Sequence, residues 1–97
     1  MNYLQDLAER IRSDIPSEKL PVDDVDALLS IYAVLLLAKG SAVTAEDVHN
    51  AWAAWMSGRE PTHSSIRPYH ELPKDTQQED QPFLAAIHKV AKDMGQA

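Results

Sequence analysis

The segment from Asp23 to Lys39 constrains the fold more than any other part of this chain. Its apolar residues recur at spacings of three and four, which places them on one broad helix face: Val25, Leu28, Leu29, Tyr32, Leu35 and Leu36. From Ile31 onward the segment is apolar on every side, a pattern typical of a helix that is packed on several sides. The longest apolar run has eight residues, whereas a membrane span needs about 20. We therefore predict the central helix of a soluble bundle, with Asp23 or Asp24 as its cap.

Three further stretches have helical spacing. They cover about residues 3–14, about residues 44–58 and about residues 79–94, and Thr44 with Asp47 forms the pattern of a capping box. Residues 59–74 hold three prolines and no helical period, so we predict a long ordered loop there. No stretch alternates with a period of two. The sequence thus predicts an all-α fold for a single domain over residues 1–97, a small bundle of four to five helices with a helical pair at 1–40 and a second part at 44–95.

Charge and composition exclude several classes of function. The net charge is −6, and a chain without a basic cluster is a poor ligand for a nucleic acid polymer or an anionic membrane. There is no cysteine, which removes disulfides, thiolate catalysis and cysteine-rich zinc sites. The N-terminal stretch has no apolar region of the kind a signal peptide needs. We expect a cytoplasmic protein that binds neither nucleic acid nor membrane.

The histidines and serines do not form a recognisable catalytic or metal site. The four histidines have no zinc-type spacing, and the serines beside His63 lack the context of a nucleophile. His88 is expected at a solvated helix position. His49 lies next to the apolar stripe of the third helix, and two interpretations stay open: a half-buried histidine that bonds a backbone carbonyl, or a contact to a ligand or to the loop. The sequence predicts no enzyme, no metal and no cofactor.

The stretch from Thr44 to Leu72 is the candidate binding region. It holds both tryptophans and three of the four histidines. Trp52 and Trp55 are three residues apart and share a helix face, so both are core residues, or one is the wall of a cleft that stacks on a flat ligand. Arg67 is the best-placed cation for a phosphate or a carboxylate. Tyr69 could pack under the loop or bond a ligand.

Two parts of the sequence carry a family resemblance: AEDVHNAWAAWMSG, and THSSIRPYHELPKDTQQEDQPFLAAIHKVAK. Over residues 45–92 the chain resembles the ryanodine-receptor repeat domain, called the RyR domain. The matching positions are the pair His49 and Trp52, the turn Pro68, Tyr69, Leu72 and Pro73, and the helices at 76–80 and 83–90. The loop after Met56 is shorter than in that family and lacks its Gly-Trp-x-Tyr-Gly segment. The whole chain also resembles a family of small uncharacterised proteins of actinobacteria and their phages.

The resemblance implies a non-catalytic module that binds a nucleotide-derived small molecule; if a phage encodes it, the protein would sequester a defence signal in the host cytoplasm. In this hypothesis a base stacks on Trp52 or Trp55, and Arg67 with the start of the third helix receives phosphate. The remaining candidates, His49, Asn50 and Tyr69, set orientation. The family pattern assigns Trp52 to the core and makes Trp55 the better candidate for the cleft wall.

A second hypothesis comes from another class of function. The Trp/Met face of the third helix and the loop at 59–74 could dock a partner protein or a second copy, so a homo-oligomer is possible. A DNA-binding helical domain is the third candidate, and the acidic net charge argues against it.

Overall fold

The computed structural model describes residues 2–95, and this part of the chain contains helices and turns but no strand. The helices are α1 (Tyr3–Ser13), α2 (Val25–Lys39), α3 (Ala45–Ser57), α4 (Lys74–Gln78) and α5 (Gln81–Asp93). Three short 3-10 turns connect them, namely η1 (Ser17–Lys19), η2 (Gly40–Ala42) and η3 (Tyr69–Glu71). The predicted all-α fold is confirmed.

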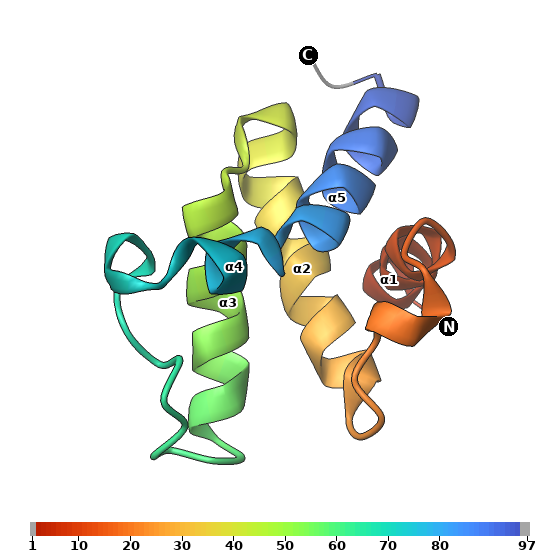
Figure 1. Cartoon of the computed structure of the whole chain (residues 1–97). Helices are drawn as coiled ribbons and strands as arrows, with labels where there is room; N and C mark the ends of the chain where they lie inside the picture. Colours follow the sequence, from red (N-terminus) through yellow and green to blue (C-terminus); the bar gives the residue numbers. More distant parts are fainter. Residues whose placement is uncertain (1, 96–97) are drawn as a thin grey trace.

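Helix α2 runs through the middle of the molecule, with α1 and α5 on one side of it and α3 on the other (Figure 1). Its buried residues are Leu28, Leu29, Tyr32, Ala33 and Leu36. By length and composition, Val25–Ala42 could cross a membrane, but a third of this window is buried in the fold. The core helix of a small globule meets the same criteria, and that is the role of α2 in this arrangement.

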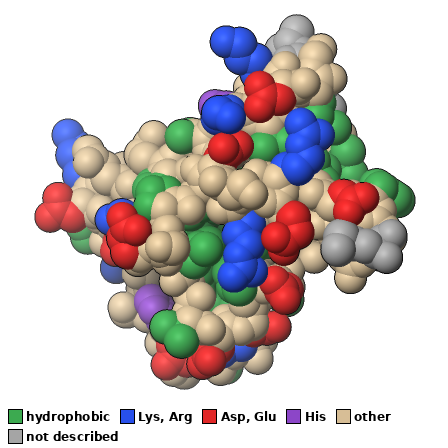
Figure 2. All heavy atoms as spheres, turned by 90° about the vertical axis from the view of Figure 1, so that its right-hand side faces the viewer, with side chains coloured by type: hydrophobic (Ala, Val, Ile, Leu, Met, Phe, Trp, Pro, Cys, Tyr) green, Lys and Arg blue, Asp and Glu red, His purple; other side chains and the backbone are tan. Residues whose placement is uncertain are grey.

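The neighbouring helices complete the core with the faces that their sequence spacing predicts. Helix α1 contributes Leu7, Ala8 and Ile11, and α5 contributes Ala86, Ile87, Val90 and Ala91. On the face that carries α1 and α5, Lys and Arg side chains lie beside Asp and Glu side chains (Figure 2). Lys89, for example, pairs with Asp14 at 3.3 Å and with Asp93 at 3.6 Å. The ends of α1 and α5 are thus linked through surface charges as well as through the core.

The start of α3 has the predicted capping box. The Thr44 hydroxyl accepts from the Asp47 backbone N–H at 3.1 Å, and the Asp47 carboxylate accepts from the Thr44 backbone N–H at 2.9 Å. Lys39 adds a bond to the same carboxylate at 2.7 Å, and this bond is the main reason why the pKa of Asp47 lies below its usual value. The box fixes where α3 begins, and therefore which face His49 and Trp52 occupy.

The segment after α3 contains more helical structure than the sequence predicted. It runs back alongside α3 (Figure 1), then forms η3, and α4 begins at Lys74. The Gln77 side chain donates to the carbonyls of Tyr69 at 3.0 Å and Leu72 at 3.2 Å. These bonds fasten η3 to α4, and the longest irregular segment after α3 is residues 58–68, called the 58–68 loop below.

Two predictions about individual side chains are wrong. Asp24 occupies the position before α2, but its φ of 54° is left-handed and its side chain makes no capping bond. Asp23 and Asp24 instead face Arg59, at 3.7 and 3.4 Å. His88 is not at a solvated position, because its Nε2 donates to the Val43 carbonyl at 2.7 Å and the residue is half-buried. That bond joins α5 to Val43, two residues before α3.

Candidate functional site

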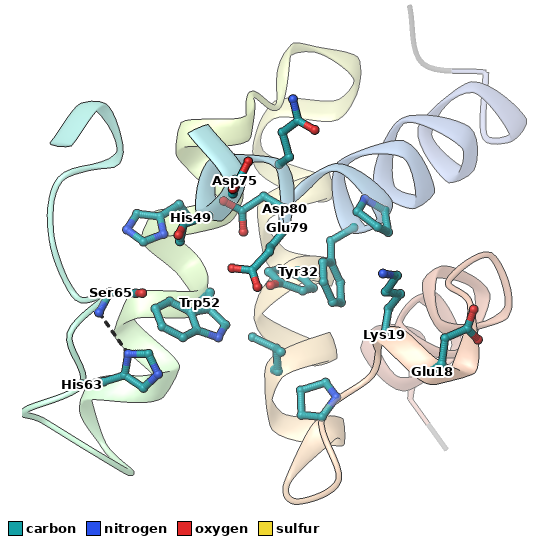
Figure 3. A pocket seen from close by; sticks show the side chains of 16 residues that line it. Glu18, Lys19, Tyr32, His49, Trp52, His63, Ser65, Asp75, Glu79 and Asp80 are labelled. Carbon is teal, nitrogen blue, oxygen red and sulfur yellow. Dashed lines mark hydrogen bonds between the residues drawn. The ribbon is translucent and has the colours of Figure 1, made fainter. Parts of the chain in front are cut away.

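A cavity of about 530 Å³ lies between α2, α3 and the short helix α4 (Figure 3). The residues that line it come from the connector before α2, from α2, α3 and the 58–68 loop, and from α4 and the start of α5. They are Glu18, Lys19, Pro21, Leu28, Tyr32, His49, Trp52, His63, Ser65, Asp75, Thr76, Gln78, Glu79, Asp80, Pro82 and Phe83. The cavity therefore depends on segments that are far apart in the sequence.

A row of rings forms the side of the cavity that belongs to α3 and the loop. His49 and Trp52 are stacked, with ring centres 5.7 Å apart and planes at 25°. His63 meets Trp52 edge to face at 5.1 Å. The spacing of three between His49 and Trp52 brings their rings together on one helix face. Figure 3 shows all three side chains on the same side of the cavity.

His49 holds this row in place. It is buried, and its Nε2 lies 2.7 Å from the Arg67 carbonyl oxygen. Since a carbonyl can only accept, Nε2 carries the proton and donates. The bond connects α3 to the end of the loop across 18 positions of sequence. Both interpretations of His49 are therefore partly right: it bonds a backbone carbonyl and orders the loop, and its ring also lines the cavity.

Tyr32 and Phe83 line the cavity on the side of α2 and α5, where Phe83 is half-buried and Tyr32 is only 1% exposed. Their ring centres are 5.6 Å apart and their planes are tilted by 48°. Burial, and secondarily the charge of Asp80, raises the pKa of Tyr32. The Tyr32 hydroxyl is therefore protonated at neutral pH and is available as a donor.

Asp80 is the unusual polar residue of the site. It is only 9% exposed, and its side chain makes no capping bond although it precedes α5. Burial raises the pKa of Asp80 to about 6; His49 acts in the opposite sense and Glu79 in the same sense. At pH 7 and above, the carboxylate is therefore mainly ionised, on a residue that is largely buried.

The cavity is acidic. Four carboxylates and one lysine line it: Glu18, Asp75, Glu79, Asp80 and Lys19. Within residues 2–95, no three His, Asp or Glu side chains lie close enough together to hold a metal ion. The arrangement can stack a flat ring and can bond a donor or a cation, whereas a phosphate inside the cavity would face several negative charges.

A second hollow, of about 510 Å³, lies between α1 and α2 and is lined by Gln5, Ala8, Glu9, Asp26, Ala27 and Ser30. It has no aromatic residue and, apart from Ala8, none of its residues is buried. It offers less to a ligand than the first cavity.

The structure brings only two of the six predicted site residues to the cavity, His49 and Trp52. Asn50 is exposed on another face of α3. The Arg67 side chain is exposed and donates to the Glu71 carbonyl at 3.2 Å. Tyr69 packs its ring 6.1 Å from His49 but does not line the cavity.

The predicted roles of the two tryptophans are reversed. Trp52 is half-buried and lines the cavity, whereas Trp55 is 8% exposed and belongs to the core. The Arg59 guanidinium lies 5.0 Å from the centre of the Trp55 ring. The Trp55 Nε1 is buried and has no hydrogen-bond partner among the described residues. The two indoles are three positions apart on α3, and only Trp52 lies among the residues that line the cavity with α4.

The sequence patterns did not identify Tyr32, Phe83 and Asp80 as residues of the site. The first two fit a core stripe, and Asp80 fits a cap in front of Gln81 and Pro82. One signal was available for Tyr32, because it is the only side chain with a hydroxyl in the apolar run of α2. No sequence signal distinguished Asp80 from the other carboxylates that precede helices.

Comparison with known proteins adds a family but no activity. No curated protein and no solved structure matches the chain. The model of one family, described as a domain of unknown function (DUF7701), matches residues 2–92. Since this match spans nearly the whole chain, the protein belongs to the DUF7701 family.

Proposed function

We propose that this domain is a non-catalytic binding module that holds a small ring-containing molecule in the cavity between α2, α3 and α4. The observation that carries the proposal is a hollow of about 530 Å³ with Trp52 and Tyr32 in its lining. Binding pockets typically combine such apolar rings with a few polar groups. A nucleobase-sized ring stacked on Trp52 would gain about 1–3 kcal/mol.

A nucleotide-derived ligand remains part of the proposal, with one change in how it binds. The base would enter the cavity, and the phosphate would stay outside it, away from Asp75, Glu79 and Asp80. Arg67 and the start of α3 are not among the lining residues, so they no longer serve as the phosphate site. The resemblance to the RyR domain supports a binder, since the pair His49 and Trp52 that carries it contributes two rings to the cavity.

The contact between His63 and Ser65 fits a binding protein better than an enzyme. Ser65 bonds His63 through its backbone N–H, at 3.0 Å, and not through its hydroxyl. That bond gives no activated nucleophile. A cytoplasmic protein, in the host cytoplasm if a phage encodes it, would act by sequestering its ligand.

A thermal-shift panel of nucleosides, cyclic nucleotides and ADP-ribose derivatives tests the proposal. A ligand at 100 times its dissociation constant adds about 2.7 kcal/mol to the free energy of unfolding. For a domain of this size, that corresponds to a rise in Tm of about 10 °C or more. Absence of a shift with every ring-containing compound would contradict the proposal.

Two matched variants locate the site. Trp52→Leu removes the indole that lines the cavity, and Trp55→Leu removes the indole that packs in the core. We expect the ligand-induced shift to be lost in the first variant and kept in the second, even though Trp55→Leu lowers the starting Tm more. The opposite result would restore Trp55 as the ring that contacts the ligand.

The alternative function, a protein-interaction or assembly module, would use a different surface from the Trp/Met face that the sequence predicted. The predicted Trp/Met face is packed in the domain, since Trp55 is buried and Met56 is half-buried. On α2, by contrast, Val34 is 54% exposed and Leu37 is 43% exposed. Light scattering of the native chain and of Val34→Lys tests this alternative: a dimer that dissociates in the variant would favour it.

A further inference from the structure

We propose that the ligand of this cavity is an organic cation: a flat ring system that carries a protonated amine or a quaternary nitrogen, with the ring against Trp52 and the positive charge at Asp80. This inference rests on the proposed binding function and adds the chemical class of the ligand. For a nucleotide-derived ligand, it means that the ring that enters the cavity carries the positive charge while any phosphate stays outside.

The carboxylate of Asp80 has no bonding partner among the described residues. The residue is nine-tenths buried, it lines the cavity, and Figure 3 shows its carboxylate among the other lining side chains. Among residues 2–95, neither the hydrogen bonds nor the ion pairs include its carboxylate, and it does not cap α5. A buried charge without a partner is costly, and a protein usually pairs it. A cationic ligand would supply the missing partner.

The other charged residues that line the cavity around Asp80 are mainly acidic. The titratable and charged groups of the remaining lining are Glu18, Lys19, Tyr32, His49, His63, Asp75 and Glu79. Asp75 and Glu79 come from α4 and the turn after it, next to Asp80, whereas Lys19 comes from the connector before α2. A cation near Asp80 would meet negative charge on this side of the cavity, and an anion would be repelled from it.

Trp52 and Phe83 line the cavity and are half-buried, so they can present ring surface to a ligand, whereas Tyr32 is only 1% exposed. A cation is attracted to the face of an aromatic ring, most strongly to that of tryptophan. A metal ion would not use these rings, and no group of three metal-ligating side chains is present in residues 2–95. Rings and carboxylates together therefore favour an organic cation over a metal ion.

Isothermal titration calorimetry at pH 7.5 with three indoles tests the inference on the intact chain. Tryptamine is a cation, tryptophol is neutral and indole-3-acetate is an anion, while the ring stays the same. We expect tryptamine to bind roughly tenfold to a hundredfold tighter than tryptophol, the range expected of a hydrogen bond to a charged group, and indole-3-acetate to bind weakest.

The outcomes separate this inference from the proposed function. Equal or tighter binding of tryptophol or indole-3-acetate would overturn the cation preference and leave the binding function standing. If none of the three binds, and the smaller series 1-methylnicotinamide, nicotinamide and nicotinate also fails, the inference is overturned. The proposed function is overturned as well only if the thermal-shift panel gives no shift.

Two substitutions identify the residue that recognises the charge. Asp80→Asn keeps the shape of the side chain and removes its charge, so tryptamine should bind it no tighter than tryptophol. Asp6→Asn makes the same chemical change at an exposed position on α1 and should keep the preference. Tryptamine binding by Asp80→Asn with unchanged affinity would overturn the role of Asp80. Since this variant loses a buried charge, we expect it to fold.

Discussion

The two sides of α2 are built differently. Toward α1 and α5 it meets apolar side chains that are almost completely buried, such as Ile11 and Ile87. Toward α3 and α4 it meets the cavity, with histidines, Trp52 and several carboxylates in the lining. The first side is held by apolar packing. On the second side α3 also packs in the core, through Val48 and Trp55. The segments beyond α3 are fastened by side chains that bond main-chain carbonyls, as His49 does at Arg67 and Gln77 does at Tyr69.

This difference separates stability from recognition. Close apolar packing resists change, because even one lost methylene group is felt. Hydrogen bonds to loop carbonyls fix the position of a segment with little buried area, so they leave space for a ligand. A domain of 97 residues has a modest core, and here the polar residues that could bind a ligand lie on one side of that core.

Ile87→Ala should have the largest effect, because the side chain is 0% exposed and packs in the core. We expect the free energy of unfolding to fall by about 2–5 kcal/mol, measured by urea unfolding. Leu37→Ala, at an exposed position of the central helix, is the control and should cost less than about 1 kcal/mol. Similar losses in both variants would mean that the packed side of α2 is not where stability resides.

Asp80→Asn should stabilise the ligand-free protein. The pKa of Asp80 is raised to about 6 in the folded state, so the folded protein binds a proton more tightly than the unfolded chain does. Stability of the native chain therefore falls as the pH rises from about 4 to about 6, and the variant escapes this loss, worth about 2–3 kcal/mol above pH 7.

The measurement is the difference in unfolding free energy between Asp80→Asn and the native chain at several pH values. This difference should grow between about pH 4 and pH 6 and stay constant above about pH 7. A difference that is the same at pH 4 and pH 7.5 would show that the carboxylate is not held in a poorly solvated site.

His49→Phe keeps a ring in the row but removes the donor to the Arg67 carbonyl. The loss should be about 1–3 kcal/mol, since the carbonyl loses its partner, and amide hydrogen exchange should increase in residues 59–68. His88→Phe is a matched control, because His88 makes a bond of the same length to the Val43 carbonyl. It should cost a similar amount without changing exchange in the loop. Faster loop exchange in both variants would argue against His49 as the residue that orders the loop.

Arg59→Gln should have the smallest effect. The guanidinium lies over Trp55 and near Asp23 and Asp24, but both carboxylates are exposed. We expect a loss of about 0.5–1 kcal/mol at low salt, and a smaller loss at 1 M salt. Arg10→Gln, at an exposed position on α1, should be neutral. A loss well above this range would mean that the contact between the loop and the connector supports the fold more than the exposure of its carboxylates suggests.

Much of the helical framework could be predicted from sequence because its signals are local. The spacing of apolar residues gave the long helices, and the Thr44 and Asp47 pair gave the start of α3. The prediction of a side-chain cap for α2 was wrong, because the left-handed backbone at Asp24 turns its side chain away from the helix and toward Arg59. The prediction of a solvated position for His88 was wrong because its partner, Val43, is 45 positions away in the sequence.

The candidate site was less predictable than the helices. His49 and Trp52 could be selected because they share a helix face and carry the family resemblance. Arg67 and Asn50 were selected for their chemistry, and the structure turns both away from the cavity. Glu79, Asp80 and Phe83 became cavity residues only where α4 and α5 meet the other helices.

The sequence by itself determined an all-α domain with an apolar central helix, since helical periodicity and capping depend on residues within a few positions of each other. Only the tertiary structure decided that Trp52 faces the cavity, that Trp55 packs in the core, and that Asp80 is buried beside His49. Those outcomes depend on how α4 and the 58–68 loop pack against α3. That packing is set by long-range contacts, which local sequence patterns do not encode.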